Sequence, residues 1–297
     1  MSRRPLRIGV LSRFAHLYST RRLLEAIEDQ GFEPVLLAPE HCLLRLSGTQ
    51  ASLFYQGELL SPCAALIPRV GGPITRLGAR LLRYFAGAGT VCLNAAEALE
   101  LARDKFASLQ VLVAAGIAVP HTVYFTEMAQ RDQAVSLVGT PLIHKLLSGS
   151  QGLGVSMAET VTAARGMLDS FMQLQHEAMV QGFLSGGEDI RVLVLYGEVI
   201  AAMRRRASEG DFRSNLHCGG HALMLAELPA HWAEVARQSA LALGLGFAGV
   251  DLMPDQQGNP LVLEVNPVPS LEGIEASSGV NIAGLIVTAL RNRLASH

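Results

Sequence analysis

The sequence predicts an α/β protein with an N-terminal parallel sheet, and three observations support this fold class. Apolar residues make up 49% of the 297 residues and charged residues 17%, so the chain can bury a sizeable core in two domains or in one two-lobed domain. Short apolar strands alternate with helical segments near the N-terminus, which is typical of parallel sheets. A strand–turn–strand segment, Gly246–Gly273, lies near the C-terminus.

The N-terminal part contains three predicted strands, at Arg7–Leu11, Glu33–Leu37 and Ala64–Pro68. The helical periodicity of Thr20–Gln30 ends at Gly31, so a helix connects the first two strands. Arg13 and Arg69 follow the first and third strands, at the sheet edge where open α/β sheets bind ligands. They are candidate anion contacts, with solvated loop arginines as the alternative.

A predicted helix begins at Ala95, with Asn94 as its N-cap, and we place the first domain boundary near residue 95. The helical pattern continues past Asp104 and Lys105 to Ala115, and ends at Gly116. Val119–Phe125 is predicted as an edge strand, because its proline fits poorly in a central one.

A glycine-rich loop follows the predicted strand Pro141–Lys145 and precedes another strand. The loop, Ser148–Gly154, offers many free backbone N–H groups and could cover phosphates. It lacks the Gly-Lys-Ser/Thr end and the following helix of a Walker loop. Glycine-rich hairpins often bind nothing, so this signal alone is weak.

The C-terminal half is predicted to contain helices and strands at Thr160–Gln175, Ala178–Leu184, Asp189–Tyr196, Val199–Met203, Pro229–Leu243 and Asn281–Leu294. The apolar strand Ala178–Leu184 could flank an adenine. The basic run from Arg204 to His217 is either a solvated loop or an anion-binding floor, in which Arg213 and Asn215 meet phosphate. We interpret His217 as structural.

The segment Gly246–Gly273 carries three hard oxygen donors on two predicted strands, Phe247–Met253 and Leu261–Val265. Glu264 and Asn266 are two residues apart and therefore point to the same face. Asp251 joins them if the turn makes the strands antiparallel. Such a set suits Mg²⁺ that holds a polyphosphate. A surface hairpin is the alternative, but Glu264 interrupts an otherwise apolar run, where a carboxylate needs a partner.

Charge and cysteine content exclude several function classes. A net charge of −2 and a pI near 6.5 argue against nucleic acid as the main partner. The four cysteines are far apart and form no CxxC pair, as expected for reduced thiols in a cytoplasmic protein. No signal peptide is expected, and Gly116 and Pro120 divide the apolar stretch 106–126, so no membrane span is expected there.

The order of these features resembles the ATP-grasp superfamily, preceded by a pre-ATP-grasp domain. Several segments are similar to the RimK-type L-glutamate ligases over essentially the whole chain. They are Leu11–Arg13, Tyr18–Ser19, Ile67–Arg69, Ala102–Lys105, Gln151–Gly154, Glu209–His217, Ala248–Asp251 and Leu271–Glu275. Segment 209–217, EGDFRSNLH, is specific to that family, whereas the Asp…Glu-x-Asn hairpin occurs across the superfamily.

The resemblance implies a role for each matching residue. ATP would be held by Lys105, Lys145, Ser148, Gly149, Ser150, Gln151, Gly152, Gly154, Gln181, Gly182, Phe183, Leu184, Asp189, Arg213 and Asn215. Lys145 and Arg213 would also be catalytic, and Asp251, Glu264 and Asn266 would bind two Mg²⁺ or Mn²⁺ ions. From the resemblance and from charge we assign the substrate to Arg13, Arg69, Arg205 and Arg206. The implied domains are 1–95, 96–185 and 186–297.

The implied reaction is ATP-dependent ligation of a carboxylate to an amine. ATP would phosphorylate the C-terminal carboxylate of a protein or peptide, possibly a small-subunit ribosomal protein, and the amine of L-glutamate would attack the acyl phosphate. The family also implies a homo-oligomer, a tetramer. The alternatives are a ligase of the same fold with another acceptor or amino acid, a nucleotide-binding regulator, and an RNA-contacting module built on Arg204–Arg206.

Overall fold

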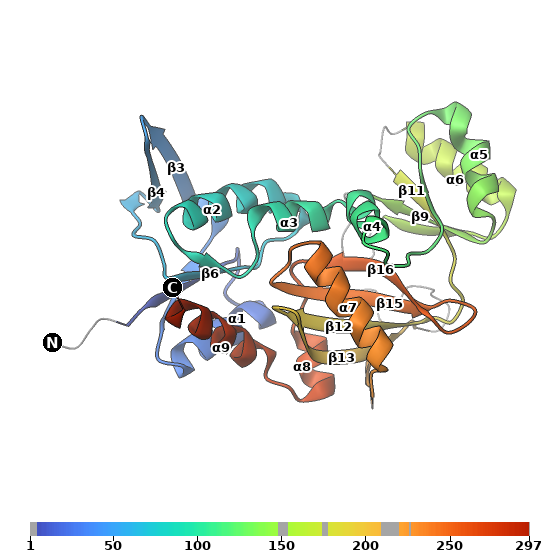
Figure 1. The fold of residues 1–297 in the computed structure, drawn as a ribbon. Coiled ribbons are helices and arrows are strands. Elements are labelled where there is room, and N and C mark those ends of the chain that lie inside the picture. The colour runs from blue at the N-terminus through green and yellow to red at the C-terminus, as the bar shows by residue number, and fades with distance from the viewer. Residues whose placement is uncertain (1–4, 148–153, 174–177, 209–219, 226, 297) are drawn as a thin grey trace.

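The fold is described from a computed structural model that covers residues 5–147, 154–173, 178–208, 220–225 and 227–296 (Figure 1). The predicted site residues Ser148, Gly149, Ser150, Gln151, Gly152, Arg213 and Asn215 lie outside these ranges, as does His217. Short 3₁₀ helices occur at η1 (Pro39–His41), η2 (Gly72–Ile74) and η3 (Met128–Gln130).

The N-terminal sheet is parallel, with the strand order β2–β1–β6–β7. Its strands are β1 (Arg7–Leu11), β2 (Glu33–Leu37), β6 (Ala65–Pro68) and β7 (Val91–Cys92), and the predicted parallel sheet is thereby confirmed. Successive residues of a strand point to opposite faces. Ile8 and Val10 therefore pack with α1 (Tyr18–Asp29) and α9 (Ile282–Ala295). Leu11 packs on the other face, with α2 (Thr75–Gly87).

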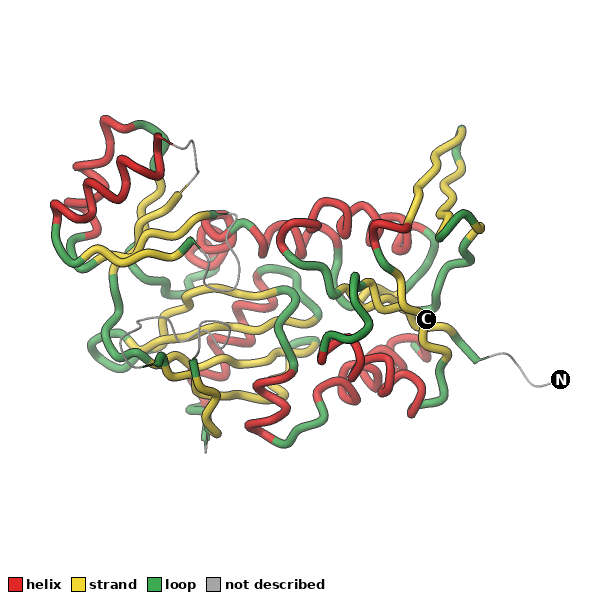
Figure 2. The backbone as a smooth tube through the Cα atoms, turned by 180° about the vertical axis from the view of Figure 1, so that it is seen from behind, coloured by secondary structure: helices red, strands yellow, loops and turns green. Residues whose placement is uncertain are grey.

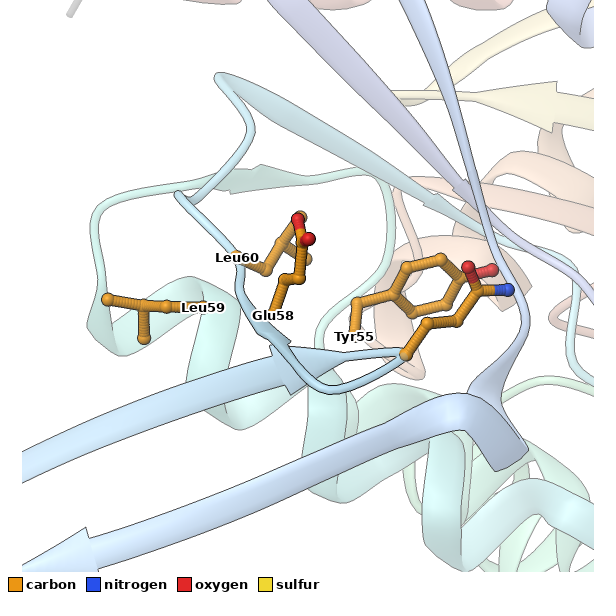
Figure 3. A pocket seen from close by; sticks show the side chains of 5 residues that line it. Tyr55, Glu58, Leu59 and Leu60 are labelled. Carbon is orange, nitrogen blue, oxygen red and sulfur yellow. The ribbon is translucent and has the colours of Figure 1, made fainter.

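An antiparallel sheet that the sequence analysis did not predict projects from this domain (Figure 1). It consists of β3 (Cys42–Ser47), β4 (Gln50–Tyr55) and β5 (Glu58–Leu59). A surface hollow of about 350 Å³ at its base is lined by residues that include Tyr55 and Leu60 (Figure 3). The hollow lies in the N-terminal domain, far along the chain from the glycine loop and the oxygen donors.

Two helices, α3 (Ala96–Arg103) and α4 (Lys105–Ala114), replace the single predicted helical pattern. The helix is interrupted at Asp104. Its side chain accepts hydrogen bonds from the backbone N–H groups of residues 106 and 107 and so caps α4. The prediction of Asn94 as an N-cap is wrong. Its buried amide instead donates to the carbonyls of Phe247 and Pro267, at 2.9 and 2.7 Å, and accepts from the Phe247 N–H at 2.8 Å.

A small antiparallel sheet with the order β10–β9–β11–β8 follows. Its elements are β8 (Thr122–Tyr124), α5 (Arg131–Val138), β9 (Leu142–Leu146), β10 (Val155–Ala158), α6 (Val161–Gln173) and β11 (Ala178–Gly182). The edge position predicted for the strand at residues 119–125 is confirmed by β8. Helices α5 and α6 cover one face, and there the buried His144 ring stacks on Phe171, with ring centroids 4.0 Å apart.

The central sheet has the order β14–β13–β12–β15–β16, and its neighbouring strands are antiparallel. Its strands are β12 (Glu188–Leu195), β13 (Glu198–Arg206), β14 (His221–Met224), β15 (Phe247–Pro254) and β16 (Pro260–Asn266). Helix α7 (Ala230–Ala242) covers one face (Figure 1). Arg204–Arg206 belongs to β13, so the solvated loop, one of the two alternatives for the basic run, is wrong at these residues.

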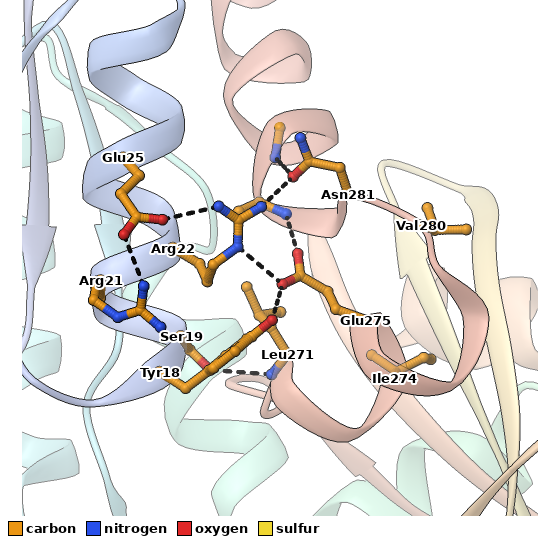
Figure 4. Close-up of polar contacts among 12 residues, drawn as sticks. Tyr18, Ser19, Arg21, Arg22, Glu25, Leu271, Ile274, Glu275, Val280 and Asn281 are labelled. Carbon is orange, nitrogen blue, oxygen red and sulfur yellow. Dashed lines mark hydrogen bonds and ion pairs between the residues drawn. The ribbon is translucent and has the colours of Figure 1, made fainter.

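The C-terminal helices α8 (Glu272–Ser278) and α9 return to the N-terminal domain (Figure 2). The buried Glu275 accepts hydrogen bonds from the Tyr18 hydroxyl, Arg22 Nε and the Ala283 N–H, at 2.9, 3.3 and 3.0 Å (Figure 4). These bonds join the two ends of the chain. Within the described ranges no single helix is long and apolar enough to cross a membrane; α8 and α9 together meet the length and composition, but meet at 105°.

Candidate active site

One face of the central sheet brings charged side chains from neighbouring strands together. Asp251 on β15 lies directly opposite Glu264 on β16 and Arg191 on β12, and facing residues of adjacent strands point to the same face. Asn266 donates from its amide to Glu264 at 2.8 Å. The strand register therefore places Asp251, Glu264 and Asn266 on one face of an antiparallel hairpin, as predicted. Its apolar opposite face packs on α7.

Asp251 is buried among guanidinium groups. Arg191 binds it through two hydrogen bonds of 2.7 and 2.6 Å, and Arg205 Nη2 lies 2.9 Å from its Oδ2. Burial opposes ionisation, but the two arginines lower the pKa of Asp251 to about 2. Arg205 also binds both oxygens of Asp189 at 2.6 Å. Asp189, predicted to hold ATP, and Arg205, predicted to bind substrate, are thus partners within a buried ion-pair network.

Of the three predicted metal ligands, Glu264 and Asn266 fit a divalent cation better than Asp251 does. In the described chain, Glu264 and Asn266 bond to each other and are half-buried, so their remaining acceptor sites face the same region. A carboxylate has about four acceptor sites, and the arginines use three of those on Asp251. Hard oxygen donors of this kind suit Mg²⁺ or Mn²⁺. Glu264 and Asn266 would be the principal ligands, with one site of Asp251 left to join them.

The charge of Glu264 acts on two lysines from other elements. Lys105, at the start of α4, donates to the Leu146 carbonyl at 3.0 Å, and Lys145 on β9 donates to Gln181 Oε1 at 2.6 Å. Burial lowers the pKa of both lysines, and the charge of Glu264 opposes that shift in each case. A buried lysine next to another cation is favourable only when an anion is nearby. This pair therefore suits the binding of phosphate.

The predicted adenine side lies at the end of β11. Gln181 is buried and bridges Lys145 to the Thr122 hydroxyl, to which its amide donates at 2.9 Å. The N–H groups of Gly182 and Phe183 donate to the carbonyls of residues 121 and 141, at 2.8 and 3.1 Å, and Leu184 follows them. Those N–H groups are therefore already used by the protein backbone. Gly154, at the end of the glycine loop, has φ +75° and accepts from the Leu146 N–H at 2.9 Å.

The four predicted substrate arginines do not form one cluster. Arg13 lies 3.6 Å from Glu40 on the exposed surface, and Arg206 pairs with Glu188. Arg205 belongs to the buried network described above. Arg69 is half-buried and donates to the Pro269 carbonyl at 2.7 Å, close in sequence to Asn266.

Two arginines were missed by the sequence analysis. Arg191 holds Asp251, and its position two residues after Asp189 on the same strand face was the available signal. Arg103, at the end of α3, faces Glu264, whose charge raises its pKa against the lowering effect of burial. It donates to the Val70 carbonyl at 2.9 Å. No local pattern identifies Arg103, because its neighbours come from distant parts of the chain.

The parallel N-terminal sheet, the two antiparallel sheets that follow it and the site between them are typical of one class, the ATP-grasp proteins, and solved structures support this class. PsnB, an ATP-grasp ligase determined in complex with a minimal precursor, is similar with a TM-score of 0.77 and 22% identity, over 97% of this chain and 99% of that chain. A RimK domain protein from Sphaerobacter thermophilus is similar with a TM-score of 0.72 and 25% identity, over 95% and 98%. The predicted ATP-grasp fold is thus confirmed.

The RimK PreATP-grasp domain family matches residues 6–99, and the RimK-like ATP-grasp domain family matches residues 102–290. Proteins named probable alpha-L-glutamate ligase are 42% identical in Thioalkalivibrio sulfidiphilus and 41% identical in Vibrio cholerae, and each match covers 98% of this chain and 97% of the relative. The chain belongs to the RimK-like ATP-grasp family. It is an ATP-dependent ligase, as the sequence predicted.

Proposed function

We propose that the protein adds L-glutamate to the C-terminal carboxylate of a protein or peptide, with ATP converted to ADP. The observation that carries the proposal is the bond of Lys105 to the Leu146 carbonyl, next to Lys145, with the charge of Glu264 acting on both lysines and Asn266 bonded to Glu264. Cations that suit phosphate and oxygens that suit a metal are thereby combined, as phosphoryl transfer to a carboxylate requires, and this transfer needs no protein nucleophile. The relatives named probable alpha-L-glutamate ligase support glutamate as the amine.

In this proposal the protein acts by positioning and charge. Gln181 orients the Lys145 ammonium, and Lys105 is oriented by the Leu146 carbonyl, so both lysines are set before nucleotide binds. Glu264 and Asn266 would hold one or two Mg²⁺ or Mn²⁺ ions, which neutralise charge on the transferring phosphoryl group when bound. Arg213 and Asn215 would contact the phosphate and the acceptor carboxylate, as the family resemblance implies.

The acceptor is proposed to be the C-terminus of a small-subunit ribosomal protein. Structures of two similar proteins, PsnB and MdnC, are described as bound to precursor peptides, which supports a peptide as the acceptor. The same observation favours a second candidate, a ligase that modifies another peptide. We also propose that the chain is divided into three domains: a pre-ATP-grasp domain at 1–95 and two ATP-grasp subdomains at 96–185 and 186–297.

The test compares amino acids in one assay. The protein is incubated with ATP, Mg²⁺ and a panel of acceptor peptides, with glutamate, aspartate, glutamine or lysine as the amine. ADP release and the mass of the acceptor are measured. We expect ADP release and a mass gain of one residue with glutamate alone. Equal use of glutamine or lysine would remove the glutamate proposal, and ADP release with a non-peptide acceptor would favour another ligase of the same fold.

A further inference from the structure

The four predicted substrate arginines differ in whether they have a carboxylate partner. Arg13 faces Glu40, and in β13 Arg205 and Arg206 pair with Asp189 and Glu188. Among the described residues Arg69 has no carboxylate partner, and the one side-chain bond it makes there is to the Pro269 carbonyl, at 2.7 Å. A guanidinium group has five N–H donors, so most of those on Arg69 remain available.

Arg103 likewise forms no ion pair with a carboxylate among the described residues, although the charge of Glu264 raises its pKa. Its Nη2 donates to the carbonyl of Val70, the residue directly after Arg69. Its Nε is buried and has no hydrogen-bond partner among the described residues. A buried N–H group without a partner is costly, so it is normally matched by water or by a ligand. We refer to Arg69 and Arg103 as the arginine pair.

The arginine pair consists of like charges held close together. Burial lowers the pKa of Arg69 to about 10, and the charge of Arg103 lowers it as well. Burial also lowers the pKa of Arg103. Arginine stays protonated in proteins, so the two cations repel each other, and the charge of Glu264 offsets this for Arg103 but not for Arg69. The protein tolerates this unfavourable arrangement at the edge of the candidate site, which is typical of a site for an anion.

The position of the pair indicates which anion it binds. Arg69 is bound to Pro269, close after Asn266, and Arg103 lies two residues before Lys105. Lys105 and Lys145 form the part of the site that suits phosphate. The arginine pair lies at the N-terminal sheet, because Arg69 directly follows β6 and Arg103 is bound to the next residue, Val70. When the amine of an amino acid attacks an activated acceptor, the free carboxylates of that amino acid lie next to the phosphates. The site must therefore hold a second anion there.

We propose that Arg69 and Arg103 together bind a free carboxylate of the incoming amino acid. This inference rests on the proposed function and names the residues that recognise its substrate. Two guanidinium groups match a planar carboxylate through parallel hydrogen bonds, which an ammonium group cannot provide. The carboxylate would also satisfy the buried Nε of Arg103 and separate the two positive charges.

The experiment compares Arg103→Gln, Arg103→Lys and Arg69→Lys with the unchanged protein. Arg83→Gln is the matched control, because Arg83 also contacts α3, through Glu97 and Glu100, but on the exposed surface. The KM for glutamate and the KM for ATP are determined from ADP release. Calorimetry measures L-glutamate binding to the protein loaded with Mg²⁺ and a non-hydrolysable ATP analogue. Heat unfolding checks that each variant is folded.

We expect Arg103→Gln to weaken glutamate binding and raise its KM roughly 10- to 100-fold, with the KM for ATP changed less than about 3-fold. Arg103→Lys and Arg69→Lys should lose less, because they keep the charge. Arg83→Gln should match the unchanged protein. An unchanged KM for glutamate in folded Arg103→Gln, or an equal rise in the KM for ATP, would overturn the proposal.

Substrate analogues identify the carboxylate without any change in the protein. Glutamine and isoglutamine each replace one carboxylate of glutamate by an amide. One of these analogues lacks the carboxylate that the arginine pair binds. Its affinity for the unchanged protein should equal the affinity of glutamate for Arg103→Gln. Arg103→Gln should then add little further loss for that analogue. An equal further loss with glutamate and with both analogues would overturn the proposal, because the residue would then act on the fold and not on a carboxylate.

The two proposals fail in different ways. Glutamate transfer that is insensitive to the arginine variants would overturn the inference and leave the proposed function standing. Arginine-dependent glutamate binding without transfer to any acceptor would support the inference and overturn the proposed function. The absence of both glutamate binding and glutamate transfer would overturn both.

Discussion

Asp251 and Glu264 lie directly opposite each other across β15 and β16, yet their carboxylates have different partners. Asp251 is buried and accepts hydrogen bonds from Arg191 and Arg205. Glu264 is half-buried and accepts one from Asn266 in the described part of the chain. A change to the neutral amide should therefore have different consequences at the two positions.

We expect Glu264→Gln to reduce ADP formation about 10²–10³-fold and to leave the fold intact. The amide keeps the size of the side chain but removes the negative charge with which Glu264 would hold a divalent cation. The measurement is ADP release as a function of Mg²⁺ concentration. ADP formation like that of the unchanged protein at low Mg²⁺ would contradict the metal assignment.

Asp251→Asn is the structural counterpart and should lower the stability as well as the activity. It leaves the buried Arg205 and the adjacent Arg191 without their full charge balance, and breaking a buried ion pair costs about 3–5 kcal/mol. Urea unfolding of both variants provides the comparison. Equal free energies of unfolding for Asp251→Asn and Glu264→Gln would show that the arginine network contributes little to stability.

His144 should make the stability depend on pH between about 4 and 6.5. The ring is fully buried on Phe171, and neither ring nitrogen has a partner among the described residues. Burial lowers the pKa of His144 to about 4, from its ordinary value of 6.5. The unfolded chain therefore binds the proton first as the pH falls. Stability should be lost from pH 6.5 down to pH 4, by up to about 3 kcal/mol.

The variant His144→Phe tests this pH dependence. Phenylalanine keeps the stacking on Phe171 and removes the titratable group and its unpaired nitrogens. Urea unfolding at several pH values should show a smaller loss of stability between pH 6.5 and pH 4 for the variant. The exposed His41 on η1 supplies a control in His41→Phe, which should leave the pH dependence unchanged. An identical pH profile for His144→Phe and the unchanged protein would refute the explanation.

The sequence predicts well those elements whose partners are near in the chain. Arg7–Leu11 and Glu33–Leu37 have the same bounds in the prediction and in the structure, because short apolar runs between turn residues determine them locally. The common face of Asp251, Glu264 and Asn266 is also predictable, because side chains alternate along a strand and a single turn joins the two strands. The solvated loop, one of two alternatives for Arg204–Arg206, is wrong because these residues belong to β13, and of the three only Arg204 and Arg206 are exposed. Arg205 is buried only because Asp189 and Asp251 come from neighbouring strands.

Asn94 illustrates the same limit at the junction of the domains. Read locally, an asparagine before a helix is an N-cap. In the structure its amide binds both Phe247, at the start of β15, and Pro267, directly after Asn266. No local pattern predicts partners more than 150 residues away in the sequence.

We expect Asn94→Ala to destabilise the protein by at least about 2 kcal/mol, since each buried backbone group left without a partner costs about 1–3 kcal/mol. Heat and urea unfolding measure the loss. Asn292→Ala, on the exposed surface of α9, is the control and should change the free energy of unfolding by less than about 0.5 kcal/mol. Similar stabilities for the two variants would show that the Asn94 bonds are replaced by water.

Glu275 should be the most sensitive residue in the contact between the two ends of the chain (Figure 4). Its carboxylate is buried and has three donors, whereas the nearby pair of Arg21 and Glu25 is exposed. A glutamine at this position cannot accept on both side-chain atoms, so one of the three donors loses its partner. We therefore expect Glu275→Gln to destabilise the protein by about 1–3 kcal/mol.

A double-mutant cycle separates the Tyr18 bond from the rest of this contact. Tyr18→Phe removes one donor to Glu275, and its effect should shrink once Glu275 is glutamine, because the two residues share that bond. Arg21→Gln is the exposed control and should cost less than about 0.5 kcal/mol. The free energies of urea unfolding of the four proteins give the coupling energy. A coupling near zero would mean that Glu275 is held by Arg22 and the Ala283 N–H alone, and that the tyrosine contributes only its ring packing.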